Sequence, residues 1–252
     1  MSQFVSETSI VRSIWGKADV ILFIFGGAAA EFALNKAVDW LYFTGKLPDN
    51  PIDRLFSTVV YAHKILFEEE KKAINAIHSI THIHQNVEAA RGHAIPDWAY
   101  RDVLYMLIHY SAAAFELLER KLTYEEKQEI FNVFYRVGKE MKLTGLPDNY
   151  EDWLITRNEH LEHHLAYSKL SEDLFKRYRL QLGPFRYYVL LQVQKLLVPQ
   201  RVFTLLGFSR SIYFPPVLNL YKSIKRLPFL KEIKFWLLPA QYRQTLKQLE
   251  QR

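Results

Sequence analysis

The chain contains no cysteine among its 252 residues. Disulfides, thiolate zinc sites, iron–sulfur clusters and cysteine catalysis are therefore excluded, and any metal must be held by His, Asp, Glu or Tyr. Long apolar runs are also missing: the stretch at residues 20–30 is well short of the ~20 residues that a membrane-spanning helix needs. The pair Gly26-Gly27 lacks the further glycine or lysine of a phosphate-binding loop, so we interpret it as a close contact between helices.

The positive and negative charges nearly balance in the first 198 residues, and the excess of basic residues lies at the end of the chain. The net charge is +6, yet residues 199–252 contain ten Lys or Arg and only two Glu. Hydrophobic residues at 49% and charged residues at 24% are ordinary globular values, so a sizeable core is expected. Aromatic residues at 15% suit either an apolar cavity or a core packed with rings.

Hydrophobic periodicity predicts an all-α fold. Helices are expected at residues 53–70, 73–87, 97–120, 124–144, 150–164, 170–179 and 184–197. No segment alternates like a strand. We divide the chain into an N-terminal segment (1–13), a helical domain (14–198), and a basic aromatic extension (199–252) packed on that domain.

The segment at residues 73–87 offers a candidate ligand. Its stripe of positions spaced by three and four residues consists of Ile74, Ile77, Ile80, His84 and Val87. The stripe excludes the other two histidines of this helix, so only His84 projects where a core or a bound group would lie. A buried imidazole needs a partner, which can be a backbone carbonyl, a water or a metal.

One reading of the histidines is a non-heme di-iron centre. The segments HSITH (78–82) and HLEHH (160–164) resemble the histidine boxes of membrane desaturases and hydroxylases. The third box and the membrane hairpins of those enzymes are missing. Glu159 and Glu162 beside the second segment indicate a solvent-exposed helix face instead.

A second reading is heme. One axial histidine on an apolar helical face, beside a helix that offers Arg and Thr, is what an all-α heme pocket requires. Arg54 and Thr58 are spaced i,i+4 and share a face of the preceding predicted helix. Spacing alone leaves this reading open.

The order of motifs from Trp15 to about Tyr242 resembles the MpaB/latex-clearing-protein oxygenase family. The resemblance rests on Trp15-Gly16-x-x-Asp19, Asn50-Pro51-x-x-Arg54-Leu55-x-x-Thr58, Ile83-His84-x-x-Val87, Gly92, His109 after an apolar run, Gly145-Leu146-Pro147, and Leu237-Leu238-Pro239 followed by Arg243. The chain departs from the family where Ser57 replaces a lysine of rubber-cleaving members, and no carboxylate base can be assigned.

The resemblance implies a globin-like helical bundle around a heme b pocket. It also implies that dioxygen is used on an apolar isoprenoid or lipid-like substrate, with cleavage of C=C bonds in characterised members. When the family's functional residues are matched to this sequence motif by motif, the resemblance implies that His84 is the axial metal ligand. It also implies that Arg54 and Thr58 line the pocket as cofactor-binding and catalytic residues, and that His109 supports the heme. We expect Nε2 of His84 to bind iron while an acceptor holds Nδ1.

We therefore predict a cytoplasmic heme-dependent oxygenase. Its basic aromatic extension would dock peripherally on an anionic membrane, and nucleic acid is not expected as a partner because no nucleic-acid module is recognised. The alternative is a non-catalytic helical protein that kept the fold and binds lipids or membranes.

Overall fold

The computed structural model describes residues 2–43, 50–225, 227 and 232–250, and this part of the chain is all-α. The helices are α1 (Ile10–Trp15), α2 (Ala18–Leu34), α3 (Asp39–Phe43), α5 (Pro51–Phe67), α6 (Glu70–Arg91), α7 (Asp97–Leu118), α8 (Tyr124–Glu140), α9 (Tyr150–His163), α10 (Lys169–Leu197), α11 (Gln200–Leu205), α12 (Phe214–Ile224), α13 (Ile233–Trp236) and α14 (Ala240–Glu250). No strand occurs in these ranges, which confirms the predicted fold class.

The helices α2 and α7 form the centre of the molecule and pack closely on each other. Gly27 of α2 lies directly against the ring of Tyr110 on α7, so a Cβ atom at residue 27 would overlap that ring. The Tyr110 hydroxyl donates to Glu31 Oε2 at 2.9 Å, which holds the ring in place. The predicted helix contact at the glycine pair is therefore confirmed.

Replacing Gly27 by Ala is expected to lower the free energy of unfolding by about 1–2 kcal/mol, because overpacking outweighs the gain in helix propensity. Gly26→Ala is the matched control: its Cβ would lie 3.3 Å from Val193 Cγ1, a side chain that can adjust. Urea unfolding of both variants measures the difference. Equal stabilities would contradict the close contact at Gly27.

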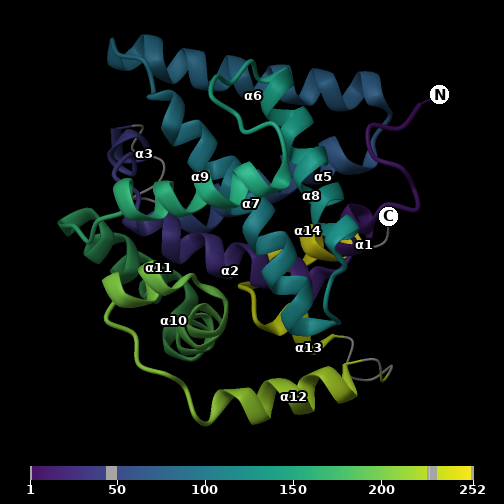
Figure 1. Cartoon of the computed structure of the whole chain (residues 1–252). Helices are drawn as coiled ribbons and strands as arrows, with labels where there is room; N and C mark the ends of the chain where they lie inside the picture. Colours follow the sequence, from purple (N-terminus) through teal and green to yellow (C-terminus); the bar gives the residue numbers. More distant parts are fainter. Residues whose placement is uncertain (1, 44–49, 226, 228–231, 251–252) are drawn as a thin grey trace.

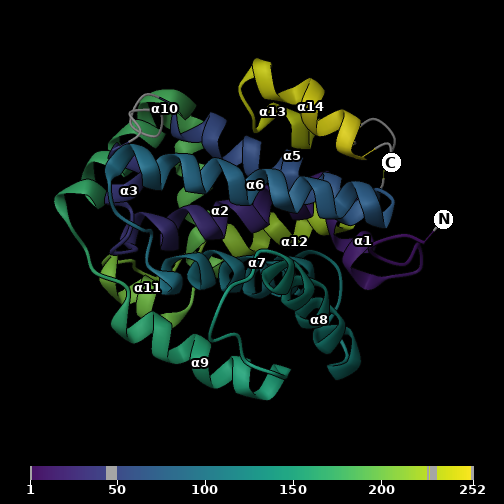
Figure 2. The ribbon, with the colours of Figure 1, turned by 90° about the horizontal axis from the view of Figure 1, so that it is seen from above.

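The helices α6 and α12 lie at opposite sides of the molecule in Figure 1, and in Figure 2, seen from above, α6 lies in front of α12. The helix α6 packs on α5 and, less extensively, on α8. Its apolar stripe is confirmed: Ile77 is buried, Ile74, Ile80, His84 and Val87 are partly buried, and His78 and His82 are exposed.

The last part of the chain folds back over the first helices. On α12 and just after it, Tyr221 Oη and Lys225 Nζ donate to Asp19 Oδ2 at 3.1 and 3.0 Å. On α14, Leu246 is fully buried and the ring of Tyr242 stacks on Phe56 with centroids 4.5 Å apart. Of the ten basic residues counted in 199–252, Arg226, Lys231 and Arg252 lie outside the described residues. The division at residue 198 stays a prediction.

Several helix boundaries differ from prediction by a few residues. The helix α5 begins at Pro51, two residues before its predicted start, because Asn50 caps it: Asn50 Oδ1 accepts from the Asp53 backbone N–H at 3.2 Å. The helix α6 continues to Arg91 and ends at Gly92, whose φ of 75° is left-handed. The two segments predicted before residue 198 are the halves of α10, which is kinked at Gly183.

The structure contains, within its described ranges, no helix with the length and apolarity needed to cross a bilayer.

Candidate functional site

The structure brings His84 and Arg54 together between α6 and α5. The positive charge of Arg54 acts on the His84 ring, and that ring packs on Tyr100, at the start of α7, with centroids 5.1 Å apart. The predicted pairing of these two helices therefore places a basic side chain beside the candidate ligand. Glu88, one helical turn after His84, is the acidic group that acts on the same ring.

His84 is held in its neutral form. Burial and the charge of Arg54 lower its pKa to about 4, against the opposing effect of Glu88. Its Nδ1 is buried and has no hydrogen-bond partner among the described residues, so the predicted acceptor for this nitrogen is not found. A neutral imidazole with an unpartnered buried nitrogen is suited to metal coordination.

Arg54 is a partly buried cation without a carboxylate partner in the described part of the chain. Its Nη1 donates to Ser57 Oγ at 3.1 Å, and partial burial lowers its pKa. Removing an unpaired guanidinium from water is costly, so this position fits an anionic group. Thr58 is less available to a bound group, because its hydroxyl already donates to the Arg54 carbonyl oxygen of the same helix at 3.2 Å.

Two residues of this region were missed in the sequence analysis. Glu88 Oε1 accepts from Tyr100 Oη at 3.0 Å and from the Ile95 backbone N–H at 2.8 Å. The carboxylate therefore ties α6 to the start of α7 beside His84. Glu88 could have been found from its i,i+4 spacing to His84, whereas Tyr100 lies beyond a loop and gives no such signal.

His109 lies elsewhere. It is nine residues beyond Tyr100 on α7, about 13 Å further along the helix axis, and no contact in the described structure joins it to His84. Burial and the charge of Arg157 lower its pKa to about 3, while a hydrogen bond to the Leu197 backbone opposes the shift. Its Nε2 is also buried without a partner in the described structure.

A charged cluster near His109 was not foreseen. Glu31 on α2 accepts two bonds from Arg157 on α9, Nη1 to Oε1 at 2.6 Å and Nη2 to Oε2 at 2.5 Å. Both side chains are almost fully buried. The pair satisfies the two buried charges, and it links α2 to α9 across the core.

The HLEHH segment is not the solvent-exposed face that Glu159 and Glu162 indicated. His160 is buried and contacts Asp102 of α7, and His164 is partly buried beside the same carboxylate. Only His163 among the three histidines is exposed. The expectation was wrong because the burying partner, α7, is distant in sequence.

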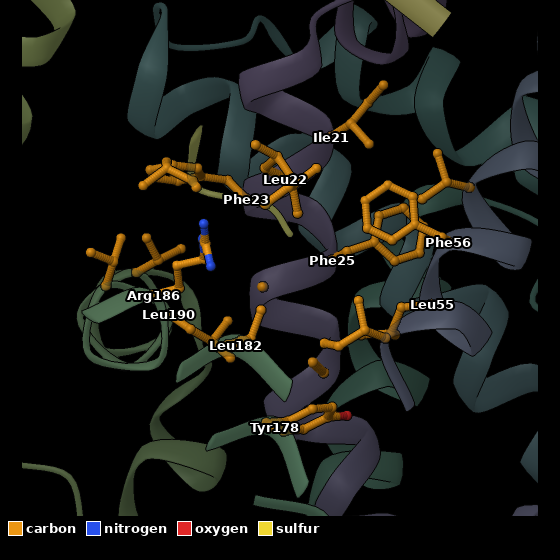
Figure 3. A pocket seen from close by; sticks show the side chains of 18 residues that line it. Ile21, Leu22, Phe23, Phe25, Leu55, Phe56, Tyr178, Leu182, Arg186 and Leu190 are labelled. Carbon is orange, nitrogen blue, oxygen red and sulfur yellow. The ribbon is translucent and has the colours of Figure 1, made fainter. Parts of the chain in front are cut away.

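An apolar cavity of about 100 Å³ lies between α2, α5 and α10. Phe25 and Phe56 form part of its wall, and Arg186 is its charged lining residue (Figure 3). Arg186 Nε donates to the Trp236 carbonyl oxygen at 3.0 Å. Leu55 and Phe56 of α5 line the cavity, whereas Arg54 and His84 do not.

The fold and these groups define an all-α protein with a partly buried, unprotonated histidine beside a cation that has no carboxylate partner among the described residues. The model of the family described as "ER-bound oxygenase mpaB/B'/Rubber oxygenase, catalytic domain" matches residues 14–247, and the chain belongs to this family. The predicted family is thereby confirmed. Membership supports an oxygenase activity and, with it, a heme or metal cofactor. No match to the chain was found among curated proteins or among solved structures.

Proposed function

We propose that the chain is a heme b-dependent oxygenase that uses dioxygen on an apolar isoprenoid or lipid-like substrate. Beyond the family match, the observation that carries the proposal is the pairing of neutral His84 with Arg54, a partly buried cation that lacks a carboxylate partner in the described structure. An imidazole ligand and a guanidinium beside it are the donor set that an iron porphyrin with carboxylate side chains needs.

In this function His84 holds the iron and Arg54 pairs with a heme propionate. When bound, heme b supplies the iron that activates dioxygen. The low pKa of His84 keeps the ring unprotonated at neutral pH, so no proton has to leave before it coordinates. Glu88 and Tyr100 keep α6 and α7 together around the ring. Thr58 and His109 have no proposed contact with the reacting atoms.

The cavity beside α5 suits the apolar part of the substrate. A cavity of about 150 Å³ can hold benzene, so the space of about 100 Å³ takes an apolar group of a few carbon atoms. It is smaller than the ~300 Å³ at which ordinary ligand pockets begin, so a porphyrin does not fit there.

Oxygen uptake by the heme-reconstituted protein, with a prenyl substrate such as squalene, tests the proposal. Uptake is expected to require heme and to fall at least ~100-fold in His84→Ala, while Arg54→Met weakens heme affinity by about 10–100-fold through loss of a charge-assisted bond. His78→Ala, an exposed histidine on the same helix, is the matched control. Uptake that is equal with and without heme would contradict the proposal.

We also propose that α12 docks on an anionic membrane. Ile212, Tyr213, Val217 and Leu220 form a surface, here the α12 patch, whose side chains are 58–84% exposed. Arg210 and Lys222 flank it. Exposed apolar and aromatic side chains beside basic ones are typical of interfacial membrane binding.

Sedimentation with phosphatidylcholine vesicles, with and without phosphatidylserine, tests this docking. The chain is expected to bind the phosphatidylserine vesicles, and the double variant Ile212→Ser/Leu220→Ser is expected to lose most of that binding. Ile155→Ser on α9 removes an equally exposed side chain and should leave binding unchanged. Vesicle binding without heme-dependent oxygen uptake would favour the non-catalytic alternative, and binding that both variants retain would exclude the α12 patch.

A further inference from the structure

Three potential metal ligands meet between α7 and the end of α9. Asp102 lies on α7, His160 in the last turn of α9, and His164 at the C-terminal end of that helix. One ligand atom from each side chain lies within 4.8 Å of the others. The Asp102 side chain is 3% exposed and that of His164 is 22% exposed, so the cluster is buried but reaches the surface at one side.

The distances suit a shared ion. His164 Nδ1 lies 3.2 Å from Asp102, and His160 Nδ1 contacts the same carboxylate more closely. Two ligands of one tetrahedral zinc ion, each about 2.0–2.1 Å from the metal, lie about 3.3 Å apart. The His160 ring has to move outward to admit the ion.

Neighbouring side chains hold the three potential ligands in place. Asn35 Nδ2 donates to Asp102 Oδ2 at 2.8 Å, which fixes the carboxylate. The ring of Trp98 packs on His164 with centroids 4.3 Å apart, and Tyr105 packs on His160 at 5.0 Å. Such supports orient ligands and raise metal affinity.

The surrounding charge allows a cation. Arg157 acts on Asp102, but its charge is balanced by Glu31. Lys36 acts on His164 and donates through Nζ to the His163 carbonyl oxygen at 2.6 Å, so it opposes binding only from the rim. The carbonyl groups at the C-terminal end of α9 favour positive charge.

We propose that Asp102, His160 and His164 bind one divalent transition-metal ion, with a water molecule in the remaining position. Two histidines and one carboxylate with an open position occur in zinc and non-heme iron(II) sites. The metal site does not include His84, the proposed heme ligand, and its three side chains join α7 to α9. It does not rest on the proposed heme function.

Calorimetric titration of the metal-stripped full-length chain with Zn²⁺ tests the proposal. One ion per chain is expected, and Asp102→Asn or His164→Gln should weaken binding at least ~100-fold. His163→Ala and His78→Ala remove exposed histidines and should bind as tightly as the original chain. Circular dichroism melting without zinc identifies a variant that fails to fold; His164→Gln, at the partly exposed position, is the variant most readily tolerated.

The melting temperature separates a metal site from a hydrogen-bonded cluster. Zinc should raise the melting temperature of the original chain but not that of His164→Gln. No zinc binding, binding that survives Asp102→Asn and His164→Gln, or binding lost in His163→Ala would overturn the proposal.

Discussion

The heme-free protein is expected to lose about 4 kcal/mol of its free energy of unfolding between about pH 7.5 and pH 5. The pKa values of His84 and His109 are about 4 and about 3 in the folded chain, both below the ordinary value of 6.5. The unfolded chain therefore binds more protons as the pH falls below 6.5. Each histidine contributes about 2 kcal/mol of the loss at pH 5, and urea unfolding at the two pH values measures it.

Removal of one of these two histidines should flatten this profile. In His109→Gln the pH-dependent loss is expected to fall to about half, whatever the variant's stability at neutral pH. His82→Gln is the control, because His82 is exposed and should leave the profile unchanged. A profile that is flat in the original chain would show that neither imidazole is buried in its neutral form.

Replacing Arg157 by Met should lower the free energy of unfolding by about 3–5 kcal/mol, because the substitution leaves the Glu31 carboxylate buried and unpaired. A loss of this size approaches the whole stability of many domains. The measurement is urea or thermal unfolding near neutral pH. Lys72→Met removes a cation from an exposed ion pair and should change stability by less than ~1 kcal/mol.

The double variant Glu31→Leu/Arg157→Met tests whether the unpaired Glu31 carboxylate causes this loss of stability. It removes both charges, so it should be more stable than Arg157→Met alone, although Tyr110 loses its acceptor. A double variant that loses the sum of the two single effects would show that the pair does not act as an interacting unit.

Periodic features of the chain could be predicted from sequence. The stripe through His84 follows from 3.6-residue spacing alone, and the structure confirms it. The α5 start was misplaced by two residues because Asn50 and Asp53 are both suitable caps. Local pattern thus predicted the helices from α5 to α10 and the face of the candidate ligand, whereas α1, α2 and α3 were not predicted.

Partners from distant segments could not be predicted in this way. His160 was assigned to a solvent-exposed face because its neighbours in sequence are acidic, yet Asp102, 58 positions away, buries it. The pairing of Glu31 with Arg157 spans 126 positions. His109 was placed near the heme by its motif, yet the groups that shift its pKa are the Arg157 side chain of α9 and the Leu197 backbone at the end of α10. The periodicity of apolar residues along the sequence does not predict contacts between such distant segments.

The visible absorption spectrum of protein supplied with heme tests the assignment of His84 most directly. The original chain is expected to show a Soret band, His84→Ala to lose it, and His109→Gln to keep it. A band that survives in His84→Ala and disappears in His109→Gln would move the iron to His109 and contradict the site. No band in any of the three proteins would contradict heme binding itself.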